Sequence, residues 1–416
     1  MGLLAGGGSS GSGRHASVST PPRPPTPAPP RPAPPPPRVP IGLTEANADL
    51  LWTPGAGAGV PAAFGPWRAA LTALHPTYLR LVLDWAALQP AAGAPARLDA
   101  PVDGCLRGIP PCGAYAGLRD ELRAIASQQR TGGGFEPVIV IDGAPAWAAL
   151  PAHGCERPGT TALSRPIQPS ALAAYRELIS AILALGRQVG VSLPYFSPWN
   201  EPNHPYFISP QRERCSTNAS AVSPGVYVEL ARAMAAELAA DGGAHQMILG
   251  ELAGYTTSGP HDTAIGEFVA DLPQDVVCLG SIWSVHDYAR RGAAARAAGP
   301  VGALERALDR RGACGQRARI WVTETGAGAA HAGAPRPPGA ADAAAGCRAL
   351  AVQLARWYAD PRVGAVFQYT FREDTLFPVG LADAALNHLY PAYYLWRAWA
   401  QNGSRTVAPP LPAQCT

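Results

Sequence analysis

Two glutamates in similar local contexts are the residues best suited to chemistry. Glu201 lies in the segment Ser-Pro-Trp-Asn-Glu-Pro-Asn (197–203), and Glu324 lies in Trp-Val-Thr-Glu-Thr-Gly (321–326). Each follows a short apolar run typical of a buried strand, with Pro or Gly within two residues, so both are predicted at junctions between a strand and a loop. Barrel enzymes carry their catalytic residues at such junctions. Two carboxylates on different strands suit the acid and the nucleophile of glycosidic bond cleavage.

These two roles require carboxyl groups with different pKa values. Trp199 and Asn200 beside Glu201 indicate a partly apolar pocket that would keep this glutamate protonated. The threonines on either side of Glu324 indicate a hydrogen-bonded site that would keep it ionised. The alternative for either glutamate alone is a salt bridge or a loop contact, and it is the pair that favours catalysis.

The elements that must position this pair alternate along the chain from Val39 onward. Strand-like runs occupy 40–44, 78–84, 137–142, 195–199, 247–252, 282–286, 320–323 and 365–369, and the clearest helix-like stretches occupy 169–190, 224–240, 340–359 and 390–399. Eight alternations predict an α/β fold, a (β/α)₈ TIM barrel. A doubly wound open sheet would share this alternation, but it usually shows a Gly-rich turn after the first strand. The run Ile-Gly-Leu-Thr-Glu-Ala-Asn (41–47) is not such a turn.

Residues 1–38 differ in composition from the rest of the chain. Residues 1–18 are rich in Gly and Ser, and thirteen prolines lie between Thr20 and Pro40. Such a tract cannot form a core and favours extended polyproline II. We therefore predict a disordered linker over residues 1–38 and a catalytic domain over 39–416. A stalk that holds the domain off a cell envelope and a tail without function are both consistent with this composition.

Charge and hydropathy argue against two classes of protein. The net charge is +3, and the four arginines within residues 1–38 exceed it, so the remainder of the chain is nearly neutral. A nucleic-acid-binding protein would need a clustered basic surface, whereas a neutral body fits an uncharged ligand such as a sugar. No run of 18 apolar residues predicts a membrane span. The start of the sequence lacks the basic and apolar regions of a signal peptide.

Eight cysteines, an even number, favour disulfides in a secreted or cell-envelope protein, with free buried thiols as the alternative. Cys105 and Cys112 bracket a short Gly/Pro-rich loop. Cys155 and Cys215 fall in the loops after two successive strands, so both could lie over the same face of the barrel. Cys278, in an apolar run read as a strand, is expected to be a core residue. No Cys/His cluster has the spacing of a zinc site, so no metal is predicted.

The motif around Glu201 resembles the Asn-Glu-Pro signature of glycoside hydrolase clan A, whose members are (β/α)₈ enzymes that cleave with retention of configuration. In that clan the motif follows the fourth strand and a second glutamate follows the seventh, as Glu201 and Glu324 do in the predicted strand order. The resemblance implies that Glu201 is the acid/base, Glu324 the nucleophile, and Asn200 the residue that hydrogen-bonds the sugar 2-hydroxyl. It implies no cofactor. It extends over residues 39–400 as a pattern and is specific only at these sites.

Residues on two further strands fit the same resemblance. Arg80 corresponds to an arginine that clan members place near the nucleophile, and a structural ion pair with Asp84 or Glu45 is the alternative. At the end of the sixth strand, the resemblance implies that Tyr288 hydrogen-bonds the nucleophile and that His286 lines the sugar site. Both could instead be ordinary residues at the rim of the barrel.

Loop residues supply the remaining candidates for sugar contacts. Trp147, in Asp-Gly-Ala-Pro-Ala-Trp, resembles the Pro-x-Trp loop of β-xylosidase-like and iduronidase-like clan members, and it could stack on a sugar or belong to the core. Asn203 and His204 follow the acid/base and could reach the aglycone. The tryptophan that clan members commonly carry after the eighth strand is missing, and Tyr369 or Phe371 could replace it.

A polar run ends the eighth strand and has two interpretations. It consists of Gln368, Arg372, Glu373 and Asp374. These residues form either a cluster of loop salt bridges or a site for a charged or heavily hydroxylated sugar.

The sequence therefore predicts a secreted, cofactor-free, retaining β-glycoside hydrolase that forms a glycosyl-enzyme intermediate on a carbohydrate substrate. A non-catalytic glycan-binding protein, associated with the cell envelope through the Pro-rich segment, is the alternative from another class. A metal-dependent barrel hydrolase would need several His and Asp at strand ends, and only His286 and Asp287 come near this pattern.

Overall fold

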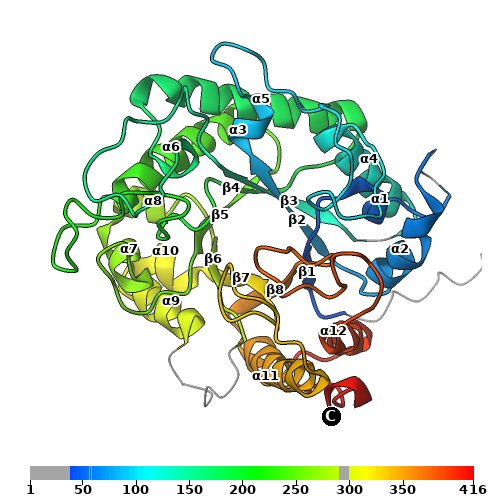
Figure 1. Ribbon diagram of the computed structural model, residues 1–416. Helices are drawn as coiled ribbons and strands as arrows, with labels where there is room; N and C mark the ends of the chain where they lie inside the picture. The colour runs from blue at the N-terminus through cyan, green and yellow to red at the C-terminus, as the bar shows by residue number, and fades with distance from the viewer. Residues whose placement is uncertain (1–37, 56, 58, 133, 290–298) are drawn as a thin grey trace, which may run out of the picture. The chain divides into compact units, whose positions relative to one another are not determined.

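The computed structural model describes residues 38–416 except 56, 58, 133 and 290–298 (Figure 1). Residues 1–37 of the predicted linker lie outside this part of the chain, so the linker, its role as a stalk and the domain boundary remain predictions. Among the described residues, no helix is long and apolar enough to cross a membrane.

Eight parallel strands close into a barrel in chain order, with the last strand paired to the first. They are β1 (Ile41–Thr44), β2 (Tyr78–Asp84), β3 (Glu136–Asp142), β4 (Tyr195–Ser197), β5 (Gln246–Leu252), β6 (Ile282–His286), β7 (Arg319–Thr325) and β8 (Val363–Tyr369). Each lies within two residues of its predicted bounds. The predicted (β/α)₈ fold is confirmed.

Helices surround the strands in Figure 1. The four predicted from sequence occur as α5 (Leu172–Val189), α6 (Ser223–Asp241), α11 (Ala340–Ala359) and α12 (Pro391–Gln401). The described residues also form α1 (Ala48–Leu51), α2 (Gly65–Thr72), α3 (Trp85–Leu88), α4 (Gly117–Arg130), α7 (Ile265–Asp271), α8 (Gln274–Val277), α9 (Pro300–Asp309) and α10 (Gly312–Arg317). Helix α5 ends where Gly190 takes a φ of 75°, a left-handed conformation that glycine adopts without strain.

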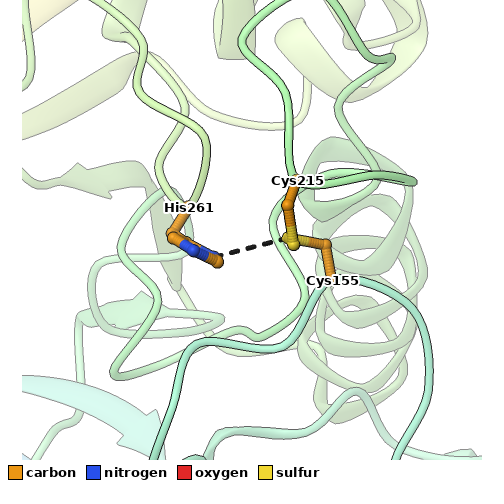
Figure 2. A group of neighbouring side chains, drawn as sticks. All are labelled: Cys155, Cys215 and His261. Atoms are coloured by element: carbon orange, nitrogen blue, oxygen red, sulfur yellow. Dashed lines mark hydrogen bonds between the residues drawn. A yellow bond between two sulfur atoms is a disulfide. The ribbon is translucent and has the colours of Figure 1, made fainter.

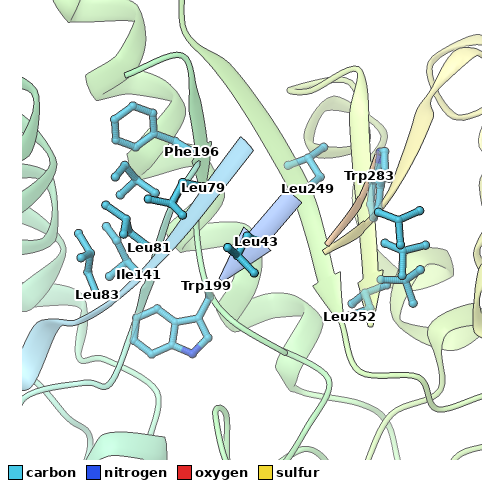
Figure 3. Packing of buried hydrophobic residues seen from close by; sticks show 14 of the residues in the cluster. Leu43, Leu79, Leu81, Leu83, Ile141, Phe196, Trp199, Leu249, Leu252 and Trp283 are labelled. Atoms are coloured by element: carbon cyan, nitrogen blue, oxygen red, sulfur yellow. The ribbon is translucent and has the colours of Figure 1, made fainter. Parts of the chain in front are cut away.

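Side chains on each strand alternate between the helix layer and the barrel interior. On β2, Leu79, Leu81 and Leu83 face outward and pack in the layer that also holds Ile141 of β3 and Trp283 of β6 (Figure 3). This outer layer is the main hydrophobic core, because it joins the sheet to the helices around it.

A second apolar layer fills the barrel interior. Val140, Ile248, Trp321 and Phe367 are buried there, each from a different strand. A Cβ atom on Gly42 of β1 would lie 2.1 Å from the Phe367 ring, so glycine is required for the ring to occupy this space. Because the interior is packed, the ends of the strands are left for a ligand, as in other barrels of this type.

Four disulfides join the loops and helices, which confirms the predicted oxidised cysteines. They are Cys105–Cys112, Cys155–Cys215, Cys278–Cys314 and Cys347–Cys415. The expectation that Cys278 is a core residue in a strand is wrong. It is exposed, caps the short helix α8 and bonds to Cys314 on α10. Pro273 is the N-cap of α8, so a helical turn follows it where the apolar run alone indicated a strand.

Candidate active site

Arg80 forms the centre of the site. Its side chain is fully buried on β2, where Nη1 donates to Glu324 Oε1 at 2.6 Å. Nη2 donates to Glu251 Oε2 and to Asn200 Oδ1, at 2.7 Å each. Burial acts to lower the pKa of Arg80, but the two carboxylates outweigh it and raise the pKa further above its ordinary value. The ion pair expected between Arg80 and Glu324 is present.

Glu324 lies in β7 and receives a hydrogen bond at each carboxylate oxygen. Arg80 reaches Oε1, and the Tyr288 hydroxyl donates to Oε2 at 2.5 Å. The neighbouring threonines do not contribute as expected. The hydroxyls of Thr323 and Thr325 are buried without a hydrogen-bond partner among the described residues. Successive side chains of a strand point to opposite faces, so these two point away from the side that Glu324 occupies.

Glu201 lies four residues beyond the end of β4, further into the loop than predicted. Its φ of 38° is rare for a residue with a side chain, and such strain of order 1–3 kcal/mol clusters at functional sites. Burial acts to raise the pKa of Glu201, but the hydrogen bond from His286 and the positive charges of His286 and Arg80 together outweigh it, so the pKa lies below its ordinary value. The expectation that an apolar pocket keeps Glu201 protonated is wrong, because the His286 imidazole donates a hydrogen bond to this carboxylate.

His286 ends β6 and connects three carboxylates. Nδ1 lies 2.7 Å from Glu201 Oε1 and 3.4 Å from Glu324 Oε2, while Nε2 lies 3.0 Å from Glu251 Oε2. Burial would lower the pKa of His286, but the three carboxylates raise it to about 10. At neutral pH the imidazole is therefore a cation that donates from both nitrogens. Its contact with Glu201 was not foreseen from the sequence.

Glu251 is a third carboxylate in the site, which the sequence analysis did not single out. It is fully buried and accepts hydrogen bonds from Arg80 and His286. Burial would raise the pKa of Glu251, but these two cations lower it to about 2. A bulge in β5 turns it inward, with a φ of 51°. The available signal was Gly250 in an otherwise apolar strand, since glycine there often marks a bulge.

The carboxylates of Glu201 and Glu324 face each other closely. One oxygen of each and one nitrogen of His286 all lie within 4.8 Å of one another. These atoms could in principle hold a metal ion. In the structure these atoms are joined by a hydrogen bond, with His286 Nδ1 2.7 Å from Glu201 Oε1.

A second group with metal-ligand atoms lies in the loops, within the described part of the chain. Cys155, Cys215 and His261 come within 4.8 Å of one another (Figure 2). The two cysteines form a disulfide, so neither offers the thiolate that a metal requires.

The site opens into a cavity at the carboxyl ends of the strands. Seven of the nine residues predicted for the site line it, namely Arg80, Asn200, Glu201, His286, Tyr288, Glu324 and Tyr369. Their strands are far apart in sequence, and barrel closure brings them together.

Trp147 and Asn203, the other two predicted residues, are not among those that line this cavity. Trp147 packs edge-on against Trp85 at 5.8 Å and donates to the carbonyl of Gln89 at 2.9 Å. Asn203 is fully buried and exchanges two hydrogen bonds with the backbone of Ala253. In the structure both side chains hold loops in place.

Aromatic side chains form one wall of the cavity. Tyr369 lines it and donates to Asp374 Oδ2 at 3.0 Å, whereas Phe371 is fully buried outside it. Of the two candidates for the missing tryptophan, only Tyr369 reaches the cavity. Phe377 also lines it and packs against Tyr288 at 4.7 Å, a contact that the sequence did not indicate.

Most of the polar run after β8 serves the loops. The Arg372 side chain donates to the carbonyls of Gly104, Ile109, Pro111 and Ala384. Glu373 pairs with Arg336. Gln368 donates to the carbonyl of Val379 and accepts from the ring nitrogen of Trp396. Glu45, an alternative partner for Arg80, instead accepts from the backbone of Arg372. These contacts support the interpretation of the polar run as a cluster of loop contacts. Asp374 differs from the other three residues of the run, because it accepts a hydrogen bond from Tyr369, which lines the cavity.

Asp142, at the end of β3, is a cavity residue that the sequence analysis did not select. Burial and the nearby charge of Asp84 raise the pKa of Asp142 to about 7. Asp84 itself caps α3 and does not contact Arg80 as an alternative partner. The Asp142 carboxyl has no hydrogen-bond partner elsewhere in the described chain, so it is available to a ligand hydroxyl.

No protein-family model matches the sequence, and no curated protein matches it significantly. Solved structures do match its fold. A family 39 glycoside hydrolase from Bacteroides cellulosilyticus matches with a TM-score of 0.53 and 16% identity, over 87% of this chain and 63% of that one. SrfJ from Salmonella typhimurium gives 0.55 and 9%, over 89% and 75%. A family 30 endoxylanase from Clostridium papyrosolvens gives 0.50 and 10%, over 88% and 72%.

These similarities concern the fold, since the identities are low. The chain spans less than two thirds of the family 39 enzyme. Families 39 and 30 both belong to glycoside hydrolase clan A. The resemblance to that clan, inferred from the motifs around Glu201 and Glu324, is therefore confirmed at the level of the fold.

Proposed function

We propose that the protein is a retaining β-glycoside hydrolase that acts on a β-linked glycan or glycoside. Glu324 attacks the anomeric carbon, the bond to the leaving oxygen breaks, and Glu201 protonates that oxygen. Glu201 then takes a proton from the water that attacks the glycosyl-enzyme. This second step releases the sugar with its original configuration and restores both carboxyl groups.

The observation that carries this proposal is the short separation between Glu201 and Glu324. Carboxyl groups of retaining enzymes lie about 5–5.5 Å apart, whereas inverting enzymes need about 6.5–9.5 Å to admit a water between nucleophile and sugar. One oxygen of Glu201 and one of Glu324 lie within 4.8 Å of each other. This upper limit on the shortest oxygen–oxygen distance supports direct attack by Glu324.

The proton for the leaving group is supplied by the pair of Glu201 and His286. In the resting site it lies on His286 Nδ1, which is 2.7 Å from Glu201 Oε1. As the glycosidic bond breaks, the proton passes to Glu201 and from there to the leaving oxygen. His286 then becomes neutral. It keeps the proton on Nε2, and this N–H goes on donating a hydrogen bond to Glu251. The attacking water returns one proton to the pair in the second step.

The cavity offers contacts for the sugar that occupies it. Arg80 fixes the Asn200 carbonyl oxygen, which leaves the amide nitrogen to donate to the 2-hydroxyl. Tyr369 presents an aromatic surface for the C–H face of a sugar ring. Asp142 is placed to accept from a hydroxyl further from the anomeric carbon.

The test is hydrolysis of 4-nitrophenyl β-glycosides of glucose, galactose, xylose and glucuronic acid, in the presence of EDTA. Glu324→Ala should abolish turnover, and azide should restore it with an inverted glycosyl azide as product. Glu201→Ala should lose roughly 10²–10⁴-fold on these substrates but far less on 2,4-dinitrophenyl glycosides, whose leaving group needs little protonation. Normal turnover of unactivated substrate by either variant contradicts the assignment.

The same assay separates the alternative functions. A glycan-binding protein without catalysis would release no nitrophenol from any substrate. A metal-dependent hydrolase would lose activity in EDTA, whereas two carboxylates working alone would not.

A further inference from the structure

A column of three stacked rings stands beside Glu201. It consists of His204, Tyr206 and Tyr255, and we call it the aromatic column. The His204 ring lies 5.1 Å from Tyr206 with 15° between the ring planes, and 5.4 Å from Tyr255 with 23° between them. All three residues line the cavity, and Tyr206 is 51% exposed. The two tyrosines therefore present aromatic surface to the cavity, while the His204 ring is stacked against both of them.

His204 adds a hydrogen-bond donor to this surface. The backbone N–H of Tyr206 donates to His204 Nδ1 at 3.1 Å, so the proton of the neutral ring is on Nε2. Burial lowers the pKa of His204, and this effect outweighs the attraction of Glu201, so the ring is neutral. Nε2 has no partner among the described residues and can donate to a ligand hydroxyl.

Arg157 holds the exposed member of the column. Its guanidinium carbon lies 3.9 Å from the centre of the Tyr206 ring, and Nη2 donates to the Tyr206 hydroxyl at 2.8 Å. A cation over the ring and a hydrogen bond at its edge restrict the rotation of this side chain. Tyr206 is thus fixed even though half of it faces solvent.

The loops that carry the column are joined to one another. The Cys155–Cys215 disulfide links the loop after β3, which carries Arg157, to the loop after β4. His261, in the loop after β5, has Nδ1 3.5 Å from Cys155 Sγ (Figure 2). A surface fixed before binding loses less conformational entropy when a ligand arrives.

We propose that the aromatic column is the subsite for the leaving group and that it takes a ring with an apolar face, a sugar or a phenol. The inference rests on the proposed role of Glu201, because an acid that protonates the leaving oxygen must lie beside the leaving group. The backbone N–H of His204 donates to the Glu201 carbonyl at 2.9 Å, so the column starts within the turn that presents the acid. Aromatic faces stack on sugar C–H faces and on phenyl rings alike.

The kinetic test compares two substrates with the same glycone. A 4-nitrophenyl glycoside carries a ring that reaches the column, whereas the matching glycosyl fluoride does not. Tyr206→Ala and Tyr255→Ala should each lower kcat/KM for the aryl glycoside about tenfold and leave the fluoride within about twofold. Tyr394→Ala, a tyrosine on α12 outside the cavity lining, is the matched control and should change neither. Equal losses on both substrates, or no loss on either, contradict the inference.

A binding test does not depend on turnover. Saturation-transfer NMR is measured on the full-length Glu324→Gln protein with phenyl β-glucoside, phenyl β-xyloside, cellobiose and xylobiose. Transfer to the phenyl protons, or to the reducing-end sugar, should be strong and should disappear when Tyr206→Ala and Tyr255→Ala are added.

The four probes distinguish a phenol from a sugar as the leaving group. They also distinguish failure of the subsite proposal from failure of the hydrolase proposal. Transfer to the phenyl glycosides alone identifies a phenol as the leaving group, and transfer to the disaccharides identifies a sugar. If a ring is saturated but no glycoside is ever hydrolysed, the column binds a ring, whereas the hydrolase proposal and the leaving-group role both fail. If no ring is saturated, the subsite is wrong whatever the activity.

Discussion

The charged groups of the site nearly balance one another. The cations of Arg80 and His286 face the carboxylates of Glu201, Glu251 and Glu324, so each buried carboxylate has a charged hydrogen-bond partner or a cation close by. Such pairing offsets the large cost of removing charges from water. One negative charge remains, and it suits the positive charge that develops at the anomeric carbon.

The first prediction at the residue scale concerns the proton shared by Glu201 and His286. Because His286 has a pKa raised to about 10 by its three carboxylates, the pair keeps its proton through neutral pH. We expect the alkaline limb of kcat/KM to lie near pH 10 in the unaltered protein. His286→Gln removes the group that holds this proton and should move the limb towards neutrality. The measurement is the pH profile of aryl glycoside hydrolysis, and an unmoved limb would refute the shared proton.

The second prediction concerns Glu251, which Arg80 and His286 hold with a pKa of about 2. Its stabilising effect is present above its ordinary pKa of 4.5 and is lost as pH falls towards 2. Glu251→Gln should lower the free energy of unfolding at pH 7 by about 3 kcal/mol, because Arg80 and His286 lose a buried partner. Urea unfolding of this variant measures the effect.

The control for Glu251 is Asp275→Asn, which removes an ion pair of Asp275 with Arg232 on the surface. This variant should unfold like the unaltered protein. If Glu251→Gln also matches the unaltered protein at pH 7, or if its deficit does not shrink on acidification, the buried network does not contribute as described.

Several residues of the site could be predicted from their neighbours in the sequence. Glu201 and Glu324 follow apolar runs, and the resemblance to clan A placed Arg80 near the nucleophile. Glu251 was missed because its side chain faces the site only after a bulge shifts the strand. The protonation of Glu201 was misjudged because its partner, His286, is 85 residues away in the chain.

At the scale of elements, the strands could be predicted because each is a short apolar run that ends at a polar or breaking residue. The runs of β2 and β6 match the structure to the residue. Predicted β4 was too long, because pairing with β3 ends at Ser197, directly before Pro198, which lacks the N–H for a further ladder bond. The run before Cys278 was misread because a four-residue helical turn and a short strand are alike in composition.

The prediction at this scale concerns α4, which carries Glu121 with 7% exposure. Burial, with the charges of Glu45 and Asp120, raises the pKa of Glu121 from 4.5 to about 8. The folded protein then holds a proton that the unfolded chain releases, so stability present at acidic pH is lost as pH rises from 4.5 towards 8. The free energy of unfolding of Glu121→Gln should therefore exceed that of the unaltered protein by about 4–5 kcal/mol at pH 8.5, and the two should be nearly equal at pH 4.5.

Denaturant unfolding at these two pH values checks the Glu121 prediction. Glu177→Gln, an exposed position on α5, is the matched control and should leave both values unchanged. A variant that is less stable than the unaltered protein at pH 8.5 would show that Glu121 is ionised and paired in the folded state.

At the scale of the whole molecule, barrel closure assembles the site. Arg80, Glu251, His286 and Glu324 lie on four different strands, and Glu201 lies in the loop after a fifth. The carboxyl ends of parallel strands meet at one end of the barrel, so residues hundreds of positions apart come within hydrogen-bond distance. From the sequence, the proximity of these residues could be inferred only from the number of predicted strands, which indicated a closed barrel.

The prediction for the whole molecule concerns residues 1–37. The barrel begins at Ile41, and Pro40 is already fixed by a hydrogen bond from the Tyr358 hydroxyl to its carbonyl at 3.0 Å. Deletion of residues 1–37 should leave the melting temperature within about 2 °C and kcat/KM within about twofold of the full chain. Thermal unfolding and aryl glycoside assays of both forms check this. A large loss in either would mean that the segment contributes to the folded domain or its site.

The most direct test of the account is to trap the intermediate. The protein is incubated briefly with 2,4-dinitrophenyl 2-deoxy-2-fluoro-β-glycosides of glucose, galactose, xylose and glucuronic acid. The fluorine slows both steps, and the good leaving group restores the rate of the first, so a glycosyl-enzyme should accumulate. A retaining mechanism through Glu324 predicts a mass increase of one fluoroglycosyl group, located on Glu324 by peptide mapping, with one equivalent of dinitrophenolate released. A label on another residue, or a hydrolysis product of inverted configuration, would contradict it.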